Sequence, residues 1–141
     1  MNATATKFGY PQSLLCEFES WAVLLRPAQV TLGSLVLVCS EPVGQFGQIS
    51  SEASAELGRA AASIESALGR AFSFDRINYL MLMMVDPDVH FHVLPRYEIE
   101  RSFEGRTFRD DAWPGPPDIT ANLGLTESDQ AALLEHLRGF F

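Results

Sequence analysis

Two histidines separated by a single residue are the side chains of this sequence best suited to chemistry. They are His90 and His92, and Asp88 precedes them at the same spacing. Because side chains along a β-strand alternate between its two faces, a strand over this segment places all three on one face. Each imidazole needs a partner for both its donor and its acceptor, so such a face is costly to bury without a function.

Three kinds of role fit this spacing. In the first, the two histidines are half-exposed strand residues with satisfied hydrogen bonds and no function. In the second, Asp88, His90 and His92 form a two-histidine, one-carboxylate site suited to Zn²⁺ or Fe²⁺. In the third, one imidazole attacks an electrophilic phosphorus while the other orients the ligand or transfers protons. The spacing alone does not choose among them.

The elements that must position this strand begin with three short apolar segments. Residues 14–19, 21–26 and 34–38 are rich in Val, Leu and aromatic residues, and Pro27 and Gly33 bracket the break before the third. This composition favours β-strands. The first part of the chain is therefore predicted to be a meander of neighbouring antiparallel strands.

A long amphipathic helix is predicted over residues 50–72, with Ser50 as its N-terminal cap. Apolar residues recur there at the helical period and form one stripe, which consists of Leu57, Ala61, Ile64, Leu68 and Phe72. Charged residues, Glu56 among them, fall mostly outside this stripe. The helix is thus expected to bury one face and to expose the other.

Two more strands are predicted over residues 76–85 and 89–96, with Asp-Pro-Asp forming a turn or bulge between them. The methionines of the first of these strands are expected to pack in the core; they are Met81, Met83 and Met84. Residues 98–123 are polar and loop-like, with an extended Pro-rich segment. A C-terminal helix is predicted from the cap Thr126 to Arg138.

Together these elements predict an α+β fold, in which an antiparallel sheet of about five strands is joined by one long helix and a C-terminal helix. The chain has 141 residues, the size of one ordinary domain. We therefore expect a single domain over residues 1–141, with a core over 14–97 and a C-terminal loop and helix over 98–141.

Charge and hydropathy limit the kinds of partner that the protein is expected to bind. The chain carries 10 Lys and Arg against 18 Asp and Glu, a formal net charge of -8 at pH 7. This charge repels phosphate backbones, so polymeric nucleic acid and anionic membranes are not expected, whereas a small anionic ligand is compatible. The longest apolar run is far too short to span a membrane, and residues 1–12 lack a secretory pattern. A cytoplasmic location is expected.

The segment His-Phe-His-Val-Leu-Pro-Arg at residues 90–96 follows a strand, a long helix and a Gly-led strand, and it resembles the histidine triad (HIT) family. The resemblance covers residues 21–96. It implies an α+β fold, a homodimer and a small nucleotide ligand. It also implies hydrolysis or transfer of nucleoside phosphoramidates, dinucleoside polyphosphates or related nucleotidyl conjugates, with no metal or other cofactor required.

Matched to the family pattern, His90 takes the place of the central nucleophile, and His92 that of the last histidine, which assists proton transfer near the phosphate. Two positions depart from the pattern. Asp88 replaces the first histidine, and Ser34 replaces a further histidine after the glycine of the third strand, where its hydroxyl is expected to donate to phosphate. A carboxylate at position 88 is expected to favour protonated His90 and to repel polyphosphate, which predicts a less anionic substrate or a weaker hydrolase.

Other polar residues are candidates for substrate contact. Arg96 can reach phosphate, or it can pair with Glu98 or Glu100 at the end of the strand. Gln29 can contact ribose or phosphate and Arg26 can contact phosphate, although both also fit ordinary solvent exposure.

The sequence thus predicts a phosphohydrolase or nucleotidyl transferase that works through a nucleotidyl-histidine intermediate on His90, assisted by His92. The predicted substrate contacts are Asp88, Ser34, Arg96 and Gln29. Two alternatives stay open: a nucleotide-binding protein with weak catalysis, and a metal-dependent enzyme that uses Asp88, His90 and His92.

Overall fold

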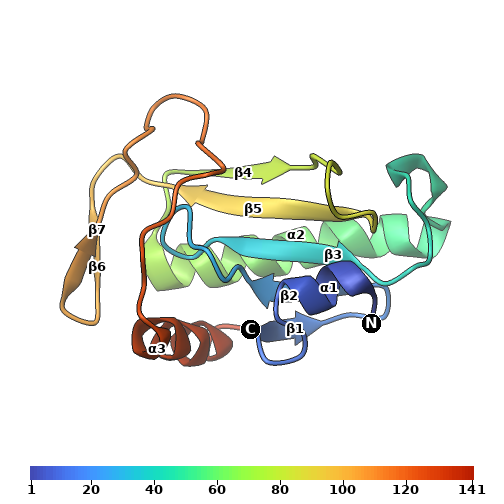
Figure 1. Ribbon diagram of the computed structural model, residues 1–141, viewed down its shortest axis with the longest axis horizontal. Coiled ribbons are helices and arrows are strands. Elements are labelled where there is room, and N and C mark those ends of the chain that lie inside the picture. The colour runs from blue at the N-terminus through green and yellow to red at the C-terminus, as the bar shows by residue number, and fades with distance from the viewer.

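A five-stranded antiparallel sheet forms the centre of the computed structural model, which describes all residues 1–141 (Figure 1). Its strands lie in the order β1-β2-β3-β5-β4. In chain order they are β1 (Leu14–Glu17), β2 (Trp21–Leu25), β3 (Leu35–Cys39), β4 (Arg76–Leu80) and β5 (His90–Arg96). Every neighbouring pair is antiparallel, which confirms the predicted sheet.

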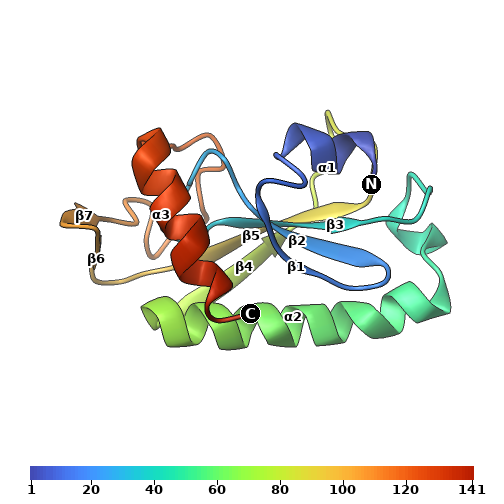
Figure 2. The ribbon, with the colours of Figure 1, turned by 90° about the horizontal axis from the view of Figure 1, so that it is seen from below.

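Helix α2 (Ser51–Phe72) covers one face of the sheet (Figure 2). As predicted, Ser50 caps it, because its side chain accepts a hydrogen bond from the backbone N–H of Ala53. The buried stripe differs in part from the predicted one, since Leu57 and Ala61 are only half-buried. Glu56, expected outside the stripe, is buried and accepts from the backbone N–H of Ser20 at 2.6 Å.

A short helix that the sequence analysis did not predict, α1 (Ala3–Lys7), lies on the opposite face of the sheet (Figure 2). Asn2 caps it. A second apolar cluster fills the space beneath it and consists of Ala5, Phe8, Ala22, Leu24, Val36 and Val38. A helix of five residues has no amphipathic period to detect and depends on tertiary packing for its stability.

The C-terminal part of the chain contains more structure than the predicted loop. Strands β6 (Arg101–Phe103) and β7 (Arg106–Phe108) form a hairpin, in which Glu104 and Gly105 both have positive φ. This is the backbone of a tight two-residue hairpin turn. Helix α3 (Glu127–Arg138) follows, with Thr126 as its cap as predicted, and buries Leu133 and Leu137 in the same core cluster as α2.

Strand β4 is shorter than the strand predicted over residues 76–85, because regular structure ends at Leu80. Met81 and Met83 are half-buried, Met83 has a φ of 53°, and Met84 is 85% exposed. The prediction that all three methionines pack in the core was therefore wrong for Met84.

A short 3₁₀ helix (Phe46–Gln48) precedes α2. None of the helices is long and apolar enough to cross a membrane.

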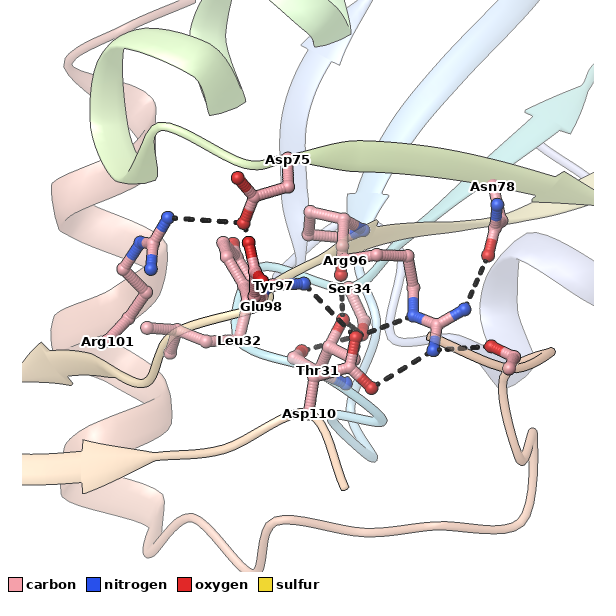
Figure 3. A network of polar contacts seen from close by, with 12 residues as sticks. Thr31, Leu32, Ser34, Asp75, Asn78, Arg96, Tyr97, Glu98, Arg101 and Asp110 are labelled. Carbon is pink, nitrogen blue, oxygen red and sulfur yellow. Dashed lines mark hydrogen bonds and ion pairs between the residues drawn. The ribbon is translucent and has the colours of Figure 1, made fainter. Parts of the chain in front are cut away.

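A buried ion pair joins the end of β5 to the C-terminal loop (Figure 3). Arg96 Nε donates to Asp110 Oδ2 at 2.7 Å, and Arg96 Nη2 donates to Asp110 Oδ1 at 3.1 Å. Arg96 also donates to Asn78 Oδ1 and to the carbonyl oxygen of Gly115. The guanidinium thus makes four hydrogen bonds within the protein, and neither Glu98 nor Glu100 is its partner as predicted.

Removing Arg96 should destabilise the fold strongly, since Asp110 would be left as an uncompensated buried charge. We expect Arg96→Met to lower the free energy of unfolding by about 3–5 kcal/mol, measured by urea denaturation followed by tryptophan fluorescence. Arg109→Met is the control, because Arg109 and Asp111 form an exposed pair. Equal losses in the two variants would contradict this account of the ion pair.

Candidate functional site

Strand β5 presents His90 and His92 on the face of the sheet that α1 covers. Their rings lie 5.2 Å apart between centroids in an edge-to-face arrangement. Phe8, which ends α1, packs against both rings, at 6.0 Å from His90 and 5.7 Å from His92. Both histidines are buried, with 2% and 7% of their surface exposed. The expectation that strand alternation brings the two imidazoles together is confirmed.

The hydrogen bond of His90 determines which of its nitrogens carries the proton. Nδ1 of His90 lies 2.6 Å from the backbone carbonyl oxygen of Asp88. Because a carbonyl can only accept, Nδ1 must be the donor, and in the neutral ring the lone pair then sits on Nε2. A lone pair on Nε2 is what a nucleophile or a general base requires.

His92 has the opposite arrangement. The guanidinium of Arg26, which can only donate, makes a long 3.4 Å contact from Nε to Nδ1 of His92. Burial, the Arg26 guanidinium and His90 together lower the pKa of His92 to about 4. His92 is therefore neutral near pH 7, and its proton is on Nε2, where it is available for donation to a ligand.

A cleft of about 280 Å³ opens beside the two rings. Lys7 and Arg26 supply its positive charge, and Asp86 pairs with Lys7 at 2.8 Å. The remaining wall is apolar and comes from Phe8 and from the segment after β4, through Leu82, Met83, Met84 and Val85. The cleft thus combines a lone pair, an imidazole N–H and two cations in a protein whose net charge is -8.

The carboxylate of Asp88 has a different partner from the one that the sequence suggested. It accepts from the hydroxyl of Thr4 at 2.8 Å and from the backbone N–H of Thr4 at 3.2 Å. Its charge is directed into α1, and Asp88 is not among the residues that line the cleft. The side chain of Asp88 therefore links α1 to the segment that precedes β5 and does not lie beside the imidazoles as expected.

Ser34 and Gln29 lie in the turn between β2 and β3, outside the cleft. Ser34 is completely buried, and its hydroxyl donates to the carbonyl oxygen of Thr31 at 2.7 Å. Gln29, 1% exposed, accepts from the backbone N–H groups of Gly33 and Ser34. Both side chains satisfy the backbone of this turn, so the predicted contacts to phosphate and ribose, and the solvent exposure considered for Gln29, do not fit their positions.

The alternative of a three-ligand metal site also lacks support in the geometry. The carboxylate of Asp88 is bound to Thr4 and does not line the cleft beside the two imidazoles. No group of three or more His, Cys, Asp or Glu side chains is arranged so that it could hold a metal ion.

Two residues of the cleft, Lys7 and Phe8, were not predicted from the sequence. An N-terminal segment carries no local signal that it will pack over a strand 80 residues later.

Comparison with solved structures identifies the fold. A histidine triad protein from Sinorhizobium meliloti superimposes with a TM-score of 0.76 at 17% identity, covering 100% of this chain and 96% of that one. One from Marinobacter aquaeolei gives a TM-score of 0.70 at 22% identity, covering 90% and 86%. A hypothetical histidine triad nucleotide-binding protein from Sulfolobus tokodaii gives 0.68 at 16%, covering 91% and 82%.

These likenesses, which extend over at least nine-tenths of the chain, show that the protein has the histidine triad fold. No protein-family model matches the sequence, and no curated protein matches it. The fold resemblance expected from the segment 90–96 is therefore confirmed by the tertiary structure.

The low pKa of His92 predicts a loss of stability in acid. The unfolded chain takes up a proton on this residue as the pH falls below 6.5, whereas the folded protein does so only near pH 4. The free energy of unfolding should therefore fall across this window, and His92→Gln should reduce that fall. Urea denaturation at several pH values tests this, with His136→Gln on α3 as the control; identical pH dependence in all three proteins would contradict it.

Proposed function

We propose that the protein is a nucleotide hydrolase or nucleotidyl transferase in which Nε2 of His90 attacks the phosphorus of a bound nucleotide. The observation that carries the proposal is the hydrogen bond from Nδ1 of His90 to the carbonyl oxygen of Asp88, because it leaves the lone pair on Nε2. The histidine triad fold supports the same function, and a neighbour in that fold is described as nucleotide-binding.

The charges of the cleft support a phosphate ligand. Lys7 and Arg26 are the cations that line it, and Lys7 is half-exposed, with 52% of its side chain accessible. An entering phosphoryl group can take the place of Asp86 as the partner of Lys7. Lys7 and Arg26 thus take the place of Ser34, Gln29 and Arg96 as the proposed phosphate contacts.

The proposed reaction has two steps. In the first, a bond forms between phosphorus and Nε2 of His90, and the bond from phosphorus to the leaving group breaks. His92, which is neutral, donates its Nε2–H to a phosphoryl oxygen and stabilises the charge that develops there. Since a neutral imidazole that lost this proton would become an anion, the leaving group takes its proton from solvent. In the second step the oxygen of a water molecule bonds to phosphorus, the phosphorus–nitrogen bond breaks with its electron pair returning to Nε2 of His90, and one proton of the water passes to solvent.

A nucleotide-binding protein with little turnover is the second candidate. It is favoured by the absence of a third imidazole from the site, since Asp88 is committed to Thr4 and Ser34 is buried in a turn. Tight binding of a nucleotide without hydrolysis distinguishes it from the enzyme.

The first test is hydrolysis of a panel of adenosine phosphoramidate, diadenosine polyphosphates and nucleotide sugars, followed by chromatography. We expect turnover that a chelator leaves intact, that His90→Ala abolishes and that His92→Ala lowers by about 10²–10³-fold. Mass spectrometry of the quenched protein should find a nucleotidyl group on the peptide that contains His90. Turnover that survives in His90→Ala would contradict the proposed nucleophile.

We further propose that the protein is a homodimer that uses the edge of β4. This strand ends the sheet and leaves one row of its backbone groups free for pairing. A groove of about 880 Å³ lies between β4 and the loop Trp113–Pro117 and offers space for part of a second copy.

Light scattering after size exclusion should give twice the chain mass of 15.6 kDa. A lysine on the edge strand, Leu80→Lys, is expected to shift the protein toward the monomer, because charged edge residues oppose pairing. Ile99→Lys is the control, at an exposed apolar residue outside β4. A wild-type protein that is monomeric at all concentrations would disprove the dimer.

A further inference from the structure

Helix α1 is fastened to the segment before β5 by Thr4 and Asp88, in addition to the exposed ion pair of Lys7 with Asp86. The Thr4 hydroxyl donates to Asp88 Oδ2 at 2.8 Å, and the Thr4 backbone N–H donates to the same oxygen at 3.2 Å. In return, the backbone N–H of Asp88 lies 3.3 Å from the Thr4 hydroxyl oxygen. Thr4 is 1% exposed and Asp88 is half-buried, so these bonds are partly shielded from water.

The same residue holds the ring of His90. The carbonyl oxygen of Asp88 accepts from Nδ1 of His90, whereas its carboxylate and its N–H are held by Thr4. Because the side chain and the N–H are both tied, the backbone of residue 88 has little freedom to rotate. The direction of its carbonyl, and with it the proton position on His90, is thereby fixed from α1.

The chemistry of the carboxylate explains why aspartate suits this position. The Thr4 hydroxyl and the Thr4 N–H both donate to Asp88, and an ionised carboxylate can accept both. A neutral imidazole has a single acceptor nitrogen and cannot accept two such bonds. The carboxylate also satisfies an N–H in the first turn of α1 that has no partner within the helix.

We infer that Thr4 and Asp88 form a positioning pair for His90, which holds the ring in the tautomer with its lone pair on Nε2. Phe8, at the other end of α1, packs on both imidazoles and reinforces the arrangement. The catalytic consequence of this inference rests on the proposed function, but the proton position on His90 does not, because it is measurable without substrate.

The test is a long-range ¹H–¹⁵N spectrum of the histidine side chains, which distinguishes a protonated from an unprotonated ring nitrogen. Wild-type His90 is expected to show a proton on Nδ1 and a lone pair on Nε2. In Thr4→Val, which keeps the shape of the side chain but removes the hydroxyl, the His90 signals should move toward a mixture of both tautomers. Thr4→Ser should restore the wild-type spectrum.

The matched control is Thr6→Val. Thr6 lies on the same helix, is exposed, and donates its hydroxyl only to the carbonyl oxygen of Asn2. Its variant should keep the wild-type His90 signals. If Thr4→Val does not fold, Asp88→Ala serves instead, since it removes the oxygen that accepts both Thr4 bonds and keeps the backbone carbonyl that accepts from His90, so its His90 signals should also move toward a mixture of tautomers.

On a substrate that the wild type turns over, Thr4→Val should lower kcat about tenfold and leave KM within about twofold, because the pair acts on the nucleophile and not on binding. A folded Thr4→Val protein with the wild-type His90 spectrum would overturn the inference. Wild-type protein that has the expected spectrum but turns over nothing would overturn the proposed function and leave the positioning pair standing.

Discussion

The alternation of side chains along β5 is the constraint on which the site depends. This strand lies between β3 and β4, and it sends Phe91 and Val93 toward α2 while His90 and His92 face α1. A shift of one residue in its pairing would place the imidazoles in the apolar core and the apolar side chains under α1. The register of one strand thus determines both the core and the chemistry.

Different partners at Nδ1 give the two buried histidines different proton positions. His90 has a carbonyl acceptor on Nδ1, whereas His92 has a guanidinium beside Nδ1 and is held neutral. One ring therefore offers a lone pair and the other offers an N–H at the same cleft. Lys7 and Arg26 bring two cations to this cleft from outside β5, and Asp86, which also lines it, pairs with Lys7.

Much of the fold was predictable because it follows from the local spacing of apolar residues along the chain. The five strands, the long helix with its serine cap and the C-terminal helix with its threonine cap follow from apolar spacing and capping residues. The hairpin β6–β7 and helix α1 were missed, since elements of three to five residues carry too little periodicity. Glu56 was misplaced because its burial depends on a backbone N–H 36 residues away.

For the site, the sequence by itself determined that two imidazoles share one strand face, because alternation is a local property of the backbone. Only the tertiary structure decided what surrounds them. It brought Phe8 and Lys7 over β5, turned Asp88 toward Thr4, and committed Ser34, Gln29 and Arg96 to turns and ion pairs. Hydrogen-bond partners that are distant in the chain are chosen by packing, which no local pattern of residues encodes.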